Sequence, residues 1–129
     1  MYGFSVTIDA NMEQAEEKVR EALMSEGFGV LTEIDVQKVM KAKLDYDRTG
    51  YKILGACNPH LAKEAIEAEP DIGLLLPCNV LLREEADGKT NVGFMDPLAV
   101  LGMVDNPHIS EVAPMVQGKL KNVAALLEK

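Results

Sequence analysis

The segment that decides the fold is YKILGACNPHLAKEAIEAEPDIGLLLPCNVLL, residues 51–82, in which two apolar runs flank a helical pattern. The first run, Tyr51–Cys57, predicts a β-strand. Asn58 is a strong N-cap residue and Pro59 is favoured at the first helical position, so a helix is expected to begin there. The second run, Ile72–Glu84, predicts the next strand. A strand, a helix and a strand are therefore expected at the centre of the chain.

A proline lies inside the second predicted strand. Pro77 has no backbone N–H to donate to a sheet, so it belongs at a sheet edge, at a bulge or at the start of the strand. Such positions can redirect the neighbouring side chain, which here is Cys78.

The N-terminal residues predict a strand, a helix and a second strand. Tyr2–Ile8 alternates large apolar residues with small or polar ones, which is the period of a half-buried strand. Asn11 and Gln14 have the spacing of a capping box, and the helix that follows is expected to close at Gly27. Phe28–Ile34 has the composition of a strand again.

A shorter helix is expected next, with Asp35 as its N-cap. Four apolar side chains of this helix are expected to point into the core: Val36, Val39, Met40 and Leu44. The residues DRTG at positions 47–50 predict the turn that leads into the central segment.

A hairpin is predicted after the central segment. Asp87-Gly88 is a strong turn signal, so the strand Thr90–Met95 is expected to pair antiparallel with the strand before it. Asp96-Pro97 then opens the segment LAVLGM, which is apolar almost all round. A segment of this kind is buried, forms an interface or covers a pocket, and burial is expected here.

The last predicted helix starts at Asn106-Pro107. Its apolar stripe consists of Ile109, Val112, Val116, Leu120, Val123 and Leu127. Pro114 is expected to kink this helix or to delay its start. Together these elements predict an α+β sandwich, in which helices cover a sheet, and one domain spanning residues 1–129.

The charge and the N-terminal sequence limit the possible partners and the location of the protein. Thirteen Lys and Arg against 21 Asp and Glu give a net charge of −8, which disfavours nucleic acid and anionic membrane surfaces. The N-terminal MYGFSVTID lacks the pattern of a signal peptide, and no apolar run approaches the ~18 residues of a membrane span. A cytoplasmic location with reduced thiols is therefore expected.

The two cysteines lie in similar settings. Cys57 and Cys78 each lie at a predicted strand end, and an asparagine follows each of them. They are expected to come close in space. Cys57 directly precedes a helix N-terminus, where the positive end of the helix dipole favours a thiolate, so a lowered pKa and the higher reactivity are expected for it.

One hypothesis is a site for a soft metal. Cys57, His60 and Cys78 would supply two thiolates and an imidazole, a set that suits zinc or monovalent copper and leaves one coordination position open. The competing interpretation is that His60 is a solvated residue of the first helical turn and that the cysteines are small buried hydrophobic residues.

A second hypothesis is redox chemistry, with Cys57 as the reactive thiol and Cys78 as its resolving partner. No Cys-x-x-Cys motif and no known catalytic motif is present. Asn79 lies inside a predicted strand, where asparagine is unusual, and could form hydrogen bonds across the site. Asp96 is a further candidate ligand-binding residue, although helix caps are the commoner role of aspartate at such a position.

Four segments of the chain resemble the domain-of-unknown-function 302 family: GFGVLTEIDV, YKILGACNPHLA, IGLLLPCNVLLRE and NVGFMDP. The resemblance covers nearly the whole chain and implies a mainly antiparallel, curved sheet of about five strands with helices packed against it. The implied order is β-α-β(4)-α, similar to the TATA-box-binding-protein-like fold. It also implies a tendency to form homodimers, and it implies neither DNA binding nor an established reaction. The family motif positions are occupied by Cys57, Asn58, Pro59, Pro77, Cys78, Asn79, Asp96 and Pro97.

The sequence therefore predicts a cytoplasmic homodimer with a pocket for a small ligand or a soft metal. The ligand-binding candidates are Cys57, Asn58, His60, Cys78, Asn79 and Asp96. A thiol-dependent redox protein and a dimeric structural or interaction module without site chemistry are the alternatives. The dimer is expected because the apolar residues Leu98–Val104 and the stripe of the last helix exceed what one small sheet covers.

Overall fold

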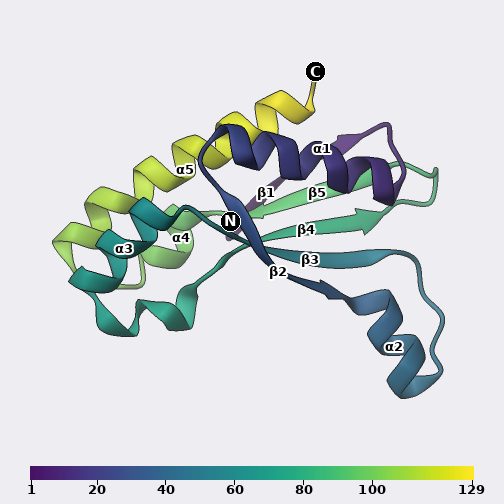
Figure 1. The fold of residues 1–129 in the computed structure, drawn as a ribbon, viewed down its shortest axis with the longest axis horizontal. Helices are drawn as coiled ribbons and strands as arrows, with labels where there is room; N and C mark the ends of the chain where they lie inside the picture. Colours follow the sequence, from purple (N-terminus) through teal and green to yellow (C-terminus); the bar gives the residue numbers. More distant parts are fainter.

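The computed structural model describes residues 1–129 and shows one open sheet with helices packed against it (Figure 1). The strands are β1 (Gly3–Ile8), β2 (Gly29–Asp35), β3 (Tyr51–Cys57), β4 (Cys78–Glu84) and β5 (Thr90–Met95). The α-helices are α1 (Met12–Ser25), α2 (Val36–Leu44), α3 (Pro59–Ala68), α4 (Pro97–Leu101) and α5 (Pro107–Leu127). The sheet order is β1-β5-β4-β3-β2, with every neighbouring pair antiparallel. The predicted α+β fold with its five-stranded antiparallel sheet is confirmed.

The two long helices, α1 and α5, lie next to each other and pack against the sheet (Figure 1). The start of α1 has the predicted capping box, in which Asn11 accepts a hydrogen bond from the Gln14 backbone N–H at 2.9 Å and the Gln14 side chain accepts one from Asn11. The helix buries one apolar stripe, consisting of Ala15, Val19, Ala22 and Leu23. This stripe belongs to the main core together with inward side chains of the strands, such as Leu54, Val80 and Val92.

The final helix is continuous. Residues Pro107–Leu127 form one α-helix that passes through Pro114, so its start is not delayed as the sequence suggested. Its predicted stripe from Ile109 to Val123 is buried against the same chain. No helix of the structure, the 21-residue α5 included, is both long and apolar enough to cross a membrane.

The region before β4 differs from the prediction. Pro70–Leu75 forms a 3₁₀-helix, η1, and the strand begins only at Cys78, after a cis peptide bond between Leu76 and Pro77. The apolar run over these residues is therefore not one strand. One reason is that Pro70 and Pro77 have no backbone N–H to donate to a neighbouring strand. The other is that Ile72 is buried in a small second apolar cluster with Ala65 and Leu101.

The prediction that α2 packs into the core is wrong. This helix has its predicted cap, because the Asp35 carboxylate accepts a hydrogen bond from the Lys38 N–H at 3.0 Å, but none of its residues is buried. In Figure 1, α2 projects beyond the end of the sheet, away from α1 and α5. The apolar residues of α2 do recur with helical spacing, but no other element of the chain packs over them and buries them.

Candidate functional site

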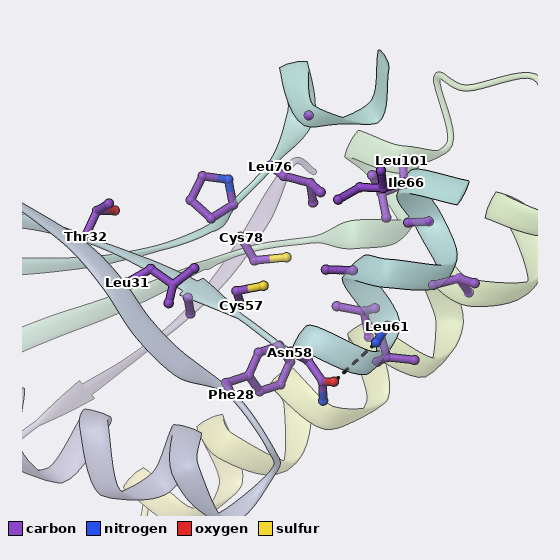
Figure 2. Close-up of a pocket in the computed structure, with 17 residues that line it drawn as sticks. Phe28, Leu31, Thr32, Cys57, Asn58, Leu61, Ile66, Leu76, Cys78 and Leu101 are labelled. Carbon is purple, nitrogen blue, oxygen red and sulfur yellow. Dashed lines mark hydrogen bonds between the residues drawn. The ribbon is translucent and has the colours of Figure 1, made fainter. Parts of the chain in front are cut away.

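An apolar cavity of about 340 Å³ lies at the end of the sheet where β3 stops and β4 begins (Figure 2). It is lined by the start of β2, by α3, by the link from η1 to β4, and by single turns of α4 and α5, and it opens to solvent beside the exposed Leu31 and Ile66. The lining residues are Phe28, Leu31, Thr32, Ala56, Cys57, Asn58, Leu61, Ala62, Ala65, Ile66, Gly73, Leu76, Pro77, Cys78, Leu101, Val112 and Val116. None of them carries a charge, so the cavity offers no counter-ion to a charged guest.

The helix α3 forms one wall of the cavity. Its residues Leu61, Ala62, Ala65 and Ile66 recur at helical spacing and therefore share the face that lines the cavity. Two of these four side chains are only methyl groups, and Gly73 on the opposite segment has no side chain. The cavity exists because Ala62, Ala65 and Gly73 lie at positions where a leucine or phenylalanine side chain would fill it.

Both cysteines line this cavity. Ala56 pairs with Cys78 across β3 and β4, which places Cys57 on the next position beside it. Figure 2 shows both thiol side chains directed from the ends of β3 and β4 toward α3. Both are free thiols; Cys78 is buried and Cys57 is partly exposed. Both residues were predicted as site residues from their positions at strand ends.

The pKa of Cys57 is raised by burial, and not lowered as its place before a helix suggested. Burial raises the pKa of Cys78 further, to about 11, and the neighbouring Cys57 adds to this shift. The apolar wall disfavours each thiolate, and at the N-terminus of α3 the Leu61 N–H already donates to the Asn58 side chain at 3.3 Å. At neutral pH both side chains are therefore neutral thiols.

The raised pKa of Cys78 predicts a loss of stability at alkaline pH. Between 9.0, its ordinary pKa, and about 11 the unfolded chain ionises this thiol while the folded chain keeps it neutral. The contribution of Cys78 to the free energy of unfolding is therefore full below pH 9 and falls as the pH rises, by about 1 kcal/mol at pH 10. Urea unfolding of the wild type and of Cys78→Ala at pH 8 and pH 10 measures this. An equal decline in both proteins would contradict it.

Asn58 is a structural residue of the cavity wall. It is buried and caps α3, while its side-chain amide donates a hydrogen bond to the Glu26 carbonyl at 3.4 Å. Gly27 approaches it closely, since a Cβ on Gly27 would lie 3.0 Å from Asn58 Nδ2, and Gly27 itself has a φ of +83°. Asn58 thus joins the end of α1 to the start of α3.

Replacement of Asn58 by alanine is expected to destabilise the fold by about 1–2 kcal/mol, because the N–H of Leu61 and the carbonyl of Glu26 both lose their partner. Asn58→Ser keeps the cap and is expected to restore about half of the loss. Chemical denaturation of the three proteins tests this. A value for Asn58→Ala within a few tenths of a kcal/mol of the wild type would mean that the cap contributes little.

Three of the predicted ligand-binding residues do not reach the cavity. His60 is exposed on the first turn of α3. Asn79 is exposed because it points to the face of β4 opposite to Cys78, as strand alternation requires. Asp96 caps α4 and accepts hydrogen bonds from the Leu98 N–H and from the Gln117 side chain. Asp96 therefore has a local structural role, and His60 and Asn79 lie on the surface outside the cavity.

The predicted metal site is not formed. No group of three or more His, Cys, Asp or Glu side chains in the structure is arranged to hold a metal ion. Cys57 and Cys78 lie on the cavity wall, but His60 is on the outside of α3 and does not join them. His60 follows Cys57 by three positions, which suggested that the two side chains lie on the same side of a helix. Cys57 belongs to β3, however, and the helix begins only at Pro59.

Several residues of the cavity were not identified from the sequence. They include Thr32, which lies beside Gly55 across β2 and β3, and Leu101 of α4, which comes from a distant part of the chain. The sequence of α3 did contain a signal for this wall. Its apolar residues recur on one face of the helix, directly after the end of β3. The apolar segment LAVLGM gave one sign that α4 could cover a pocket, but nothing in the sequence indicates that α5 completes the wall.

Comparison with known proteins places the chain in a family whose function is not established. No curated protein matches it. The chain is similar to the crystal structure of an uncharacterized conserved protein DUF302 from Bacillus stearothermophilus, with 28% sequence identity, a TM-score of 0.91 and coverage of 98% of each chain. The family model described as "Domain of unknown function DUF302" matches residues 4–127. The chain therefore belongs to the DUF302 family.

Proposed function

We propose that the protein binds a small, uncharged and mainly apolar molecule in the cavity beside Cys57 and Cys78. The observation that carries this proposal is the composition of the wall, in which 13 of 17 residues are hydrophobic and none is charged. Transfer of a charged group into such a site without a partner costs several kcal/mol, so a neutral ligand is favoured. An apolar ligand regains the contacts that an unfilled cavity lacks.

The volume of the cavity limits the size of the ligand. A cavity of about 150 Å³ accepts benzene, and sites for drug-sized molecules begin near about 300 Å³. At about 340 Å³, this cavity suits a bicyclic aromatic group or a medium-length alkyl chain. Few polar groups line the wall, and Asn58 already uses its oxygen in the α3 cap. Thr32 is the remaining side-chain hydroxyl at the wall, so at most one or two polar atoms of a ligand find partners.

The geometry gives less support to thiol redox chemistry. Burial raises the pKa of both thiols and leaves little thiolate at neutral pH. Redox-sensing cysteines are activated by the opposite shift. As neutral thiols, Cys57 and Cys78 are soft, polarisable wall residues that suit an apolar or aromatic guest.

A fluorescence titration with the neutral probe N-phenyl-1-naphthylamine tests the proposal. Saturable binding with one site per chain is expected. Competition by decanol, decanoate and decylamine then tests the charge preference, and decanol is expected to displace the probe at least about tenfold more effectively than either charged homologue. Equal displacement by all three compounds, or no saturable binding of the probe, would contradict the proposal.

A further inference from the structure

A groove of about 520 Å³ lies on the face of the sheet opposite to the main core. Val80 and Leu82 of β4 and Val92 of β5 are buried in that core, so strand alternation directs the residues next to them to the other face. The groove is lined by residues of β1, β4 and β5, by the residues before β1 and by one residue of α4. It shares no lining residue with the cavity beside the cysteines and is therefore a separate site.

The groove contains a glycine that the fold does not require. Gly93 lies between Ser5 of β1 and Leu81 of β4 in the register of the sheet, so this position of the face carries no side chain. Its φ is not positive, and a Cβ there would meet only the Leu81 Cβ at 3.8 Å. A glycine inside a strand weakens the strand and often marks a place where a ligand approaches the backbone closely. Space for a guest above β5 accounts for this glycine.

Two asparagines line the same groove, Asn79 on β4 and Asn91 on β5. Asparagine is disfavoured in strands, so two of them on one face of neighbouring strands are unusual. The Asn91 amide donates a hydrogen bond to the Thr7 hydroxyl at 2.9 Å, which fixes its orientation. Asn79 is exposed, so its amide can donate to a guest. The sequence singled out Asn79 as an unusual strand residue, and the groove gives it a place in a site.

The charge of the groove differs from that of the chain. None of its 13 lining residues is acidic, although 21 of the 129 residues of the chain are Asp or Glu. Arg83 is the charged side chain of the lining, and its Nη1 lies 3.2 Å from the Glu85 carboxylate. This pair lies at the surface, where ion pairs contribute little, and the guanidinium has five N–H donors in all. The groove therefore offers a cation and amide donors to a negatively charged group.

The apolar residues of the groove lie between its polar ones. Asn79 and Arg83 are four residues apart on β4, which corresponds to about 13 Å along the strand, and Leu81 lies midway between them. Gly93 is the cross-strand partner of Leu81, and Asn91 is the partner of Arg83. The middle of the groove is thus apolar and flat, and one of its ends carries the guanidinium and an amide.

We propose that this groove binds a small, flat carboxylate. The apolar body of the ligand lies over Gly93 beside Leu81, and its carboxylate accepts hydrogen bonds from Arg83. Charge complementarity carries this choice of ligand, because a charge-assisted hydrogen bond to a guanidinium is among the strongest contacts a carboxylate makes in a protein. The cavity beside the cysteines has no charged residue, so the two sites take ligands of opposite character.

Equilibrium dialysis with 2-naphthoate tests the site. One saturable site per chain is expected, with the same affinity in the presence and absence of saturating N-phenyl-1-naphthylamine. The neutral analogue 2-naphthamide is expected to bind at least about tenfold more weakly, because it lacks the charge that Arg83 recognises. No saturable binding, equal affinities of the acid and the amide, or displacement of 2-naphthoate by the naphthylamine would overturn the proposal.

Two substitutions then locate the ligand. Gly93→Val places a side chain over the floor of the groove and is expected to raise the dissociation constant for 2-naphthoate at least about tenfold, with an unfolding midpoint no lower than that of the wild type. Arg83→Gln is expected to remove the preference for the acid over the amide. Arg48→Gln is the matched control, because it removes the same charge from a residue that does not line the groove. An unchanged affinity of Gly93→Val, or equal losses in Arg83→Gln and Arg48→Gln, would contradict binding in the groove.

Discussion

Replacing Ala62 by phenylalanine is expected to lower the affinity for N-phenyl-1-naphthylamine by at least about 30-fold, or about 2 kcal/mol. Ala62 lies on the cavity-facing side of α3 and is only partly buried, so the larger side chain can extend into the open space. The phenyl ring then occupies volume that the probe needs. Because the ring fills space that is already present, the variant is expected to be at least as stable as the wild type.

Lys63→Phe is the matched control for this substitution. Lys63 is the next residue of α3 and is exposed, and its one charged contact is the surface pair with Glu67. The same aromatic ring at this position is expected to leave the affinity for the probe within about twofold of the wild type, since surface pairs contribute little. If both variants lose affinity equally, the probe binds elsewhere on α3.

Replacing Gly55 by valine is expected to destabilise the fold by about 3 kcal/mol and to weaken binding of the probe. A Cβ at this position would lie 2.8 Å from Pro77 Cγ and would also collide with the Thr32 hydroxyl. Both neighbours line the cavity, so the added side chain must displace part of the wall. Urea unfolding and the probe titration on the same preparation measure the two effects.

Gly93→Val provides the comparison for Gly55→Val. Gly93 lies on β5 of the same sheet, and a Cβ there would meet only the Leu81 Cβ at 3.8 Å, an ordinary contact. This substitution is expected to be neutral or stabilising, because valine favours the strand conformation. A loss of stability equal to that of Gly55→Val would show that the contact with Thr32 and Pro77 is not the cause.

The order of the elements could be predicted from the sequence because local signals determine it. The cap at Asn11, the pair Asn58-Pro59 and the turn at Asp87-Gly88 all act over a few residues, and each is present in the structure. The conformation of Pro70–Leu75 could not be predicted in this way. Its apolar residues suit a strand equally well, and the packing of Ile72 against Leu101 depends on α4, which is distant in the sequence.

The candidate site was predictable only in part for the same reason. Cys57 and Cys78 were found because one ends β3 and the other begins β4, and both line the cavity. The sequence did not show that His60 and Asn79 lie outside the cavity, because this depends on which way each side chain points. The direction of the two side chains is set by the start of α3 at Pro59 and by the start of β4 at Cys78. A shift of either start by one residue would change the direction.

The rate at which iodoacetamide alkylates Cys57, with and without saturating N-phenyl-1-naphthylamine, tests whether the ligand binds in the cavity beside the thiols. Cys57 is the partly exposed thiol of the cavity wall, and Cys78→Ala leaves it as the single reactive cysteine. If the probe occupies the cavity, it covers this thiol, and the rate is expected to fall at least about tenfold at constant pH. An unchanged rate at full saturation would show that the ligand does not bind beside Cys57 and would contradict the proposed function.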